Sequence, residues 1–218
     1  MNFSKKALAI QPSITLAISA KAKEMKSQGI DVIGFGVGEP DFNTPENIQE
    51  AAIKAIRDGH TKYTPASGII ELKKAVVNKF WKENSLKYND SQIIISTGAK
   101  QCLANLFQAV LNPLDEVLIQ VPYWVSYPEL IQLADGVPVF VETDEKDNFK
   151  LSLDKLQAAV SERTKMIIVN TPNNPTGTVY NKEELQMIAD FAKEHDLLIL
   201  SDEIYEKVIY DGNKHISI

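Results

Sequence analysis

Between residues 90 and 210, short apolar runs alternate with longer amphipathic stretches. The runs are apolar throughout, as expected for strands that are covered on both faces. Each of the first four is followed by a stretch whose apolar residues recur at helical spacing, which predicts an α/β fold with three layers, α/β/α, around a mostly parallel mixed sheet. The predicted strands are 93–95, 117–119, 137–141, 166–169 and 197–200, and the predicted helices are 99–111, 125–133, 153–160 and 182–194.

The first ninety residues have a different pattern, which predicts three helices. Ser13 is a candidate cap for a helix that runs to residue 28, and Gly29 is its expected stop. Pro45 suits the first position of a second helix that ends near residue 59. A third helix is predicted over 69–83. The loop 34–43 contains three glycines and a proline, so its backbone is expected to approach another group closely.

The composition narrows the class of protein. The 218 residues are 44% hydrophobic and 24% charged, which is typical of a globular domain. A net charge of -6 argues against nucleic-acid binding, which usually needs a basic face, and no apolar run approaches the ~20 residues of a membrane helix. The single cysteine, Cys102, fits a reducing compartment, so a cytoplasmic location is expected. The histidines at 60, 195 and 215 lack metal-ligand spacing, so no metal is expected.

Two polar segments follow buried strands directly, Asn173–Gly177 after one and Ser201–Tyr205 after the next. They bring Asn174, Asp202 and Tyr205 to the carboxyl ends of two strands, where open α/β sheets bind ligands. Asp202 there can pair with a protonated ring nitrogen, and Tyr205 can reach an adjacent ring substituent. The alternative is structural: a capping aspartate, a core tyrosine and an asparagine in a turn.

Two further segments have both a functional and a structural interpretation. Ser96–Lys100 lies between a predicted strand and a predicted helix, so its backbone N–H groups form either a phosphate site or an ordinary turn. It has neither the P-loop nor the dinucleotide-binding spacing. Pro122–Pro128 follows the next strand, and its aromatics either stack on a planar ring or pack the loop.

Taken together and in order, these motifs resemble the N-terminal part of a class I aminotransferase. Enzymes of this family depend on pyridoxal phosphate (PLP) and have fold type I, and the bacterial aspartate aminotransferase branch is the most similar. The resemblance extends over the whole chain. It rests on the N-terminal arm and on these segments: Gly38–Phe42, Lys62–Pro65, Thr97–Lys100, Pro122–Trp124, Asn173–Gly177 and Ser201–Tyr205.

The resemblance implies roles for residues that would hold the cofactor ring. Asp202 would keep the pyridine nitrogen protonated and so make the ring an electron sink. Tyr205 and Asn174 would bond the phenolic oxygen. Trp124 would stack on the ring face.

It also implies phosphate and substrate contacts. Backbone amides of Gly98, Ala99 and Lys100 would bind the phosphate, and Tyr63 would reach the phosphate of a partner subunit in a homodimer. The backbone N–H of Gly38 would bind the substrate carboxylate, with Trp124 and Asn174 nearby. Residues 1–43 would form an arm and first helix at the interface, and 44–218 a PLP-binding large domain that is incomplete at its C-terminus. The expected reaction transfers an amino group from an L-amino acid, with aspartate favoured, to a 2-oxo acid.

One departure from the family is large. The lysine that forms the Schiff base is expected roughly thirty residues beyond Asp202, but the chain ends sixteen residues beyond it. Lys100, Lys207 and Lys214 do not stand at the family's position. The sequence therefore predicts that this polypeptide alone does not transaminate.

Three alternatives remain. Another fold type I enzyme, such as a C–S lyase or an enzyme that forms a cyclopropane ring, would use the same ring-holding residues. A non-catalytic fragment would retain only dimerisation or cofactor-binding surfaces. A nucleotide-binding doubly wound domain is less consistent with the sequence, because both glycine fingerprints are missing.

Overall fold

The computed structural model describes residues 3–10, 14–34, 36, 38 and 42–218. The chain divides into two compact units. The sheet unit comprises Met1–Ile10 and Ile70–Ile218, and the helical unit comprises Gln11–Ile69. The expected domain boundary between residues 43 and 44 stays a prediction.

The sheet unit is built on four parallel strands in the order β2-β1-β3-β4. The strands are β1 (Glu116–Val121), β2 (Val137–Glu142), β3 (Thr164–Asn170) and β4 (Leu198–Asp202). Four of the five predicted strands are therefore confirmed, within two residues at each end. Each described strand pair is parallel, so the antiparallel part of the expected mixed sheet is not seen among the described residues.

The predicted strand at 93–95 is wrong for this structure. Ile93 has an extended backbone, with φ -108° and ψ 131°, and its side chain is buried. Ile94 is 70% exposed. A strand needs a neighbour for its backbone hydrogen bonds, and 93–95 pairs with none of the four described strands.

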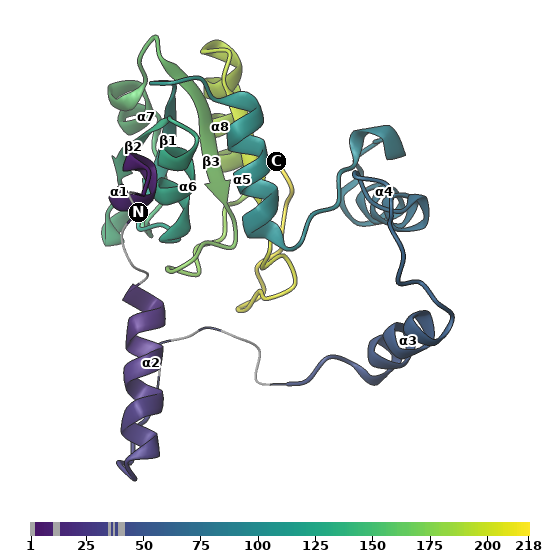
Figure 1. The fold of residues 1–218 in the computed structure, drawn as a ribbon. Helices are drawn as coiled ribbons and strands as arrows, with labels where there is room; N and C mark the ends of the chain where they lie inside the picture. Colours follow the sequence, from purple (N-terminus) through teal and green to yellow (C-terminus); the bar gives the residue numbers. More distant parts are fainter. Residues whose placement is uncertain (1–2, 11–13, 35, 37, 39–41) are drawn as a thin grey trace. The chain divides into compact units, whose positions relative to one another are not determined.

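Helices cover both faces of the sheet, as predicted (Figure 1). On one face lie α5 (Ala99–Val110) and α6 (Ser126–Leu133), and on the other lie α7 (Leu153–Ala159) and α8 (Lys182–Glu194). Alternate strand residues enter the two cores, because successive side chains point to opposite faces. One core includes Val117, Ile168, Phe107 and Ile131, and the other includes Leu118, Ile167, Leu156 and Ile188.

The strand order places a switch point beside β1. The chain runs from β1 outward to β2 and then returns to β3 on the other side of β1. Right-handed crossovers in opposite directions put their helices on opposite faces, which accounts for α6 on one face and α7 with α8 on the other. Ligands of open α/β sheets bind outside the carboxyl ends of the strands at such a point.

The remaining elements complete the sheet unit. Helix α1 (Lys5–Ala9) is joined to the turn after α6 by a 2.6 Å ion pair between Lys6 and Asp135. Helix α4 (Ile70–Asn84) is joined to the segment after β4 by ion pairs Lys79–Glu206 and Lys207–Glu83. Short 3-10 helices occur at Asp90–Gln92 and Glu145–Asp147.

The helical unit contains α2 (Ile14–Ser27) and α3 (Glu46–Arg57), which confirms the first two predicted helices. Gly29 follows α2 with a φ of +79°, which suits the expected stop. Pro45 is the N-cap of α3 and not its first helical residue. The predicted cap Ser13 and residues 39–41 of the glycine loop lie outside the described residues. In the part of the chain that the structure describes, no helix combines the length and apolar character needed to cross a membrane.

Candidate functional site

A pocket of about 150 Å³ opens at the carboxyl edge of the sheet, beside the switch point. The last residues of β3 and β4 and residues that follow β1, β3 and β4 line it together with the first residue of α5. The lining residues are Ala99, Trp124, Tyr127, Asn170, Asn174, Asp202, Ile204 and Tyr205. The structure thus brings together Trp124, Asn174, Asp202 and Tyr205, as the order of motifs along the sequence predicted.

Asp202 ends β4, and two protein donors fix its carboxylate. The hydroxyl of Tyr127 donates to Oδ2 at 2.7 Å, and the backbone N–H of Ile204 donates to Oδ1 at 3.2 Å. Burial first, and then the negative charge of Asp202, raise the pKa of Tyr127 far above its ordinary value. The phenol therefore stays protonated and keeps donating.

Asn174 and Tyr205 meet on the same side of the pocket. Asn174 Nδ2 donates to Tyr205 Oη over 3.4 Å, a long hydrogen bond. Behind them, the buried side chain of Asn170 links the ends of β3 and β4. Its Oδ1 accepts from the backbone N–H of Asn174 at 2.8 Å, and its Nδ2 donates to the carbonyl of Asp202 at 2.9 Å. Asn170 therefore sets the spacing between two of the predicted site residues.

An aromatic wall and a helix start complete the pocket. Trp124 meets Tyr127 edge-on, with ring centroids 5.4 Å apart. Lys100 Nζ lies 5.1 Å from the centre of the Trp124 ring, within cation–π range. Gly98 caps α5 with a φ of +80°, which favours glycine. Its N–H already donates to Ser96 at 2.9 Å, so the first-turn amides of Ala99 and Lys100 are the better placed anion donors.

Two predicted site residues, Tyr63 and Gly38, belong to the helical unit, and both are exposed. Their contacts with a partner's phosphate and with substrate stay predictions.

Sequence reasoning missed Tyr127 and Asn170 as pocket residues. Both carried a signal. Tyr127 lies three residues after Trp124, about one helical turn. Asn170 is a polar residue directly after the four apolar residues 166–169 of its strand.

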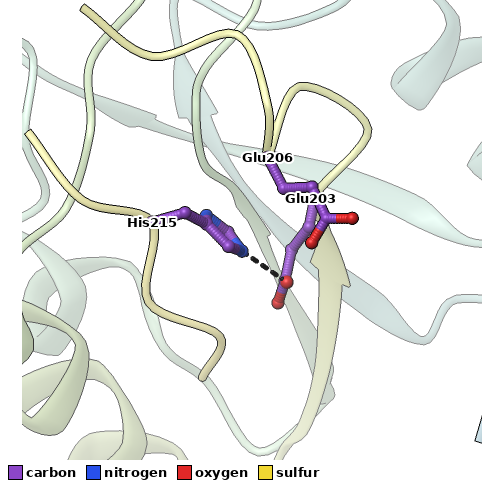
Figure 2. Close-up of side chains that lie close together, drawn as sticks. All are labelled: Glu203, Glu206 and His215. Carbon is purple, nitrogen blue, oxygen red and sulfur yellow. Dashed lines mark hydrogen bonds and ion pairs between the residues drawn. The ribbon is translucent and has the colours of Figure 1, made fainter. Parts of the chain in front are cut away.

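A second polar cluster lies near the end of β4, where Glu203, Glu206 and His215 approach one another (Figure 2). Nε2 of His215 lies 2.7 Å from Glu203, and Lys79 Nζ lies 2.6 Å from Glu206. The second carboxylate oxygen of Glu203 accepts from two serine hydroxyls. These residue types can ligate a metal, but both carboxylates already have protein partners. The cluster attaches residues 215–217 and α4 to the end of β4.

The donor set in the pocket suits a planar cationic ring with an acidic tail. The Asp202 carboxylate suits a protonated ring nitrogen, and the Asn174 amide and Tyr205 phenol suit an oxygen on the ring. The Trp124 indole offers an aromatic surface for stacking. The start of α5 favours an anion, because its first N–H groups point outward and the helix dipole is positive there. The residues present therefore fit a pyridoxal phosphate molecule.

Comparison with known proteins gives the family of the chain. Residues 30–218 match the family model described as aminotransferase class I and II. The aspartate aminotransferase of Bacillus subtilis (strain 168) is 53% identical over 100% of this chain and 56% of that protein. The aspartate aminotransferase of Bacillus sp. (strain YM-2) is 55% identical over 96% of this chain and 53% of that protein.

A solved structure gives the same result. The aspartate aminotransferase from Thermus thermophilus with maleate has a TM-score of 0.96 and 47% identity, over 100% of this chain and 56% of that one. This match confirms the expected α/β fold. The chain spans about half the length of the relatives it matches. With a family match over most of its residues and 53% identity along its whole length, this chain belongs to the class I and II aminotransferases.

Proposed function

We propose that the pocket binds pyridoxal 5'-phosphate, the cofactor of this family, and that the protein serves the transfer of an amino group from an L-amino acid to a 2-oxo acid. One observation carries the proposal: Asp202, Asn174, Tyr205 and Trp124 line one pocket that reaches the start of α5. If these side chains only packed the loops, a carboxylate, an amide, a phenol and an indole would not need to line the same pocket.

Each side chain has a defined task. The cofactor, when bound, supplies an electron sink that stabilises negative charge at the substrate's α-carbon. Asp202 holds the proton on the ring nitrogen, and the hydrogen bonds from Tyr127 and Ile204 keep its carboxylate in place. Tyr205 and Asn174 donate to the ring oxygen, and Trp124 excludes water from one ring face. Amides at the start of α5 bind the phosphate.

We favour aspartate as the amino donor. The relatives named above are aspartate aminotransferases, and the Thermus thermophilus structure was solved with maleate, a dicarboxylate of similar length. Aromatic amino acids, alanine and prephenate stay open as substrates, and so does another fold type I reaction, because the ring-holding residues are compatible with all of them. A panel of amino donors separates these cases.

The pocket supplies no lysine of its own among the residues that line it. Lys100 packs against Trp124, and Lys207 pairs with Glu83. Covalent catalysis needs a placed and activated amine. We therefore propose that these 218 residues bind the cofactor without a covalent bond, and that turnover needs a lysine from elsewhere.

A homodimer and a cytoplasmic location are part of the same proposal. The exposed side chain of Tyr63 is available for contact with a second subunit. Sedimentation of the purified protein, with and without the Tyr63→Ala change, tests whether it forms a dimer.

The main experiment is a titration of the purified protein with PLP, followed by absorbance. We expect saturable binding that Asp202→Ala weakens about 10- to 100-fold, because a charge-assisted hydrogen bond is worth about 1.5–3 kcal/mol. Asp190→Ala, which removes an exposed acid on α8, should leave binding unchanged. Saturable binding that is unaffected by Asp202→Ala would contradict the assigned site.

Borohydride reduction and mass spectrometry then locate any covalent adduct. We expect no adduct concentrated on a single lysine and no sustained turnover of aspartate with 2-oxoglutarate. One dominant modified lysine together with turnover would show that this chain is a complete catalyst.

A further inference from the structure

We propose that Tyr127 is a positioning residue for cofactor binding: its neutral hydroxyl fixes the Asp202 carboxylate so that the carboxylate faces a ring nitrogen. This inference rests on the proposed function and adds a residue to it. The role is indirect, because Tyr127 acts through Asp202.

Tyr127 contacts two of the residues that line the pocket, Asp202 and Trp124. It is the second residue of α6, and its side chain is 2% exposed. Its hydroxyl donates to Asp202 Oδ2 at 2.7 Å, and its ring meets the edge of the Trp124 ring at an interplanar angle of 87°. A shift of Tyr127 would therefore move both the carboxylate and the aromatic wall.

The chemistry of the donor matters as much as its place. A lysine or arginine at this position would neutralise Asp202 and compete with a cationic ring. The phenol donates a hydrogen bond without adding charge, so the full negative charge of Asp202 stays available. Burial keeps the pKa of Tyr127 raised, so the phenol does not ionise beside the carboxylate.

The Asp202 carboxylate can still accept a hydrogen bond from a ligand. Two ionised oxygens accept about four hydrogen bonds, and the described protein donors are the Tyr127 hydroxyl and the Ile204 N–H. The two donors hold different oxygens, so the carboxylate plane is fixed at two points. A third donor, such as a ring N–H, then meets an acceptor that is already oriented, which lowers the entropy cost of binding.

The test compares two ligands on two variants. The ligands are PLP and an analogue that has a carbon atom in place of the ring nitrogen. Tyr127→Phe keeps the ring and removes only the hydroxyl. We expect it to weaken PLP binding about tenfold and to leave the affinity for the analogue nearly unchanged, because the analogue has no nitrogen for Asp202 to meet.

Tyr180→Phe is the matched control. Tyr180 is also buried, and its hydroxyl donates to Gln120 at 2.7 Å on the opposite face of the sheet. Loss of the Tyr180 hydroxyl should lower the midpoint of thermal unfolding about as much as Tyr127→Phe does. It should leave the affinities for PLP and for the analogue unchanged. Equal losses for PLP and the analogue in Tyr127→Phe would mean that Tyr127 only packs the pocket, and would overturn the inference.

Two further variants distinguish a failure of this inference from a failure of the proposed function. If Asp202→Ala weakens PLP binding and Tyr127→Phe does not, the inference fails and the proposed function stands. If Asp202→Ala has no effect, the proposed function fails and the inference fails with it. If Tyr127→Phe does not fold, Tyr127→Gln retains an uncharged N–H donor: a kept preference for PLP over the analogue supports the inference, and a lost preference overturns it.

Discussion

Replacement of Asn170 by alanine should damage stability and cofactor binding together. The Asn170 side chain makes three hydrogen bonds, to the N–H of Asn174 at 2.8 Å, the carbonyl of Asp202 at 2.9 Å and the carbonyl of Pro172 at 3.2 Å. Each bond contributes about 0.5–1.5 kcal/mol net, so the loss of all three should cost about 2–4 kcal/mol. That is a large part of the total stability of a domain, about 5–15 kcal/mol.

Urea unfolding and PLP titration measure the two effects on the same variant. We expect a lower urea midpoint with an unchanged slope and an affinity for PLP about tenfold weaker, because Asn174 and Asp202 both lose a constraint. Asn173→Ala is the control. Asn173 is buried in the same loop, but among the described residues its side chain accepts hydrogen bonds from Thr176 and from no residue of β4. Asn173→Ala should lower stability with little loss of affinity, and equal losses in the two variants would refute the bridging role of Asn170.

Two predictions concern stability outside the pocket. The Ser161 hydroxyl first, and then Arg163, lower the pKa of Glu116 below its usual 4.5. A lowered folded-state pKa adds stability above the unfolded-state value, and that stability is lost as the pH falls through the folded-state value. The free energy of unfolding should therefore fall less between neutral pH and a pH below about 4.5 for Glu116→Gln than for the unaltered protein. An equal fall in the two proteins would contradict this. Asn181 and Glu184 form a capping box at the start of α8, so Asn181→Ala should cost about 1 kcal/mol in urea unfolding, whereas exposed Lys182→Ala should change little.

The elements that sequence predicted well were those with local signals. Helix α8 was predicted with its observed ends, because its periodic apolar face lies entirely within residues 182–194. The strand at 93–95 was wrong because three isoleucines favour an extended backbone but cannot supply a pairing partner. Pairing is a long-range property, and short apolar runs do not encode it.

The site was predictable in part for the same reason. Asn174, Asp202 and Tyr205 follow strands directly, so the strand-end rule placed them at one edge. Tyr127 was missed because its contact with Asp202 spans 75 residues and depends on how α6 packs on the sheet. Asn170 looked like the last residue of a strand, and nothing local shows that its side chain turns toward β4.

The C-terminal end of β4 is hydrogen-bonded to residues on both faces of the sheet. Asp202 is bonded to Tyr127, which packs in the core under α5 and α6. The next residue, Glu203, is bonded to His215 and Ser217, and their neighbours Ile216 and Ile218 pack in the core under α7 and α8. Adjacent residues are thus anchored in opposite directions, so the strand end cannot rotate about its own axis without breaking one set of bonds. The Asp202 carboxylate is therefore held in one orientation by contacts in both cores and not by the loops alone.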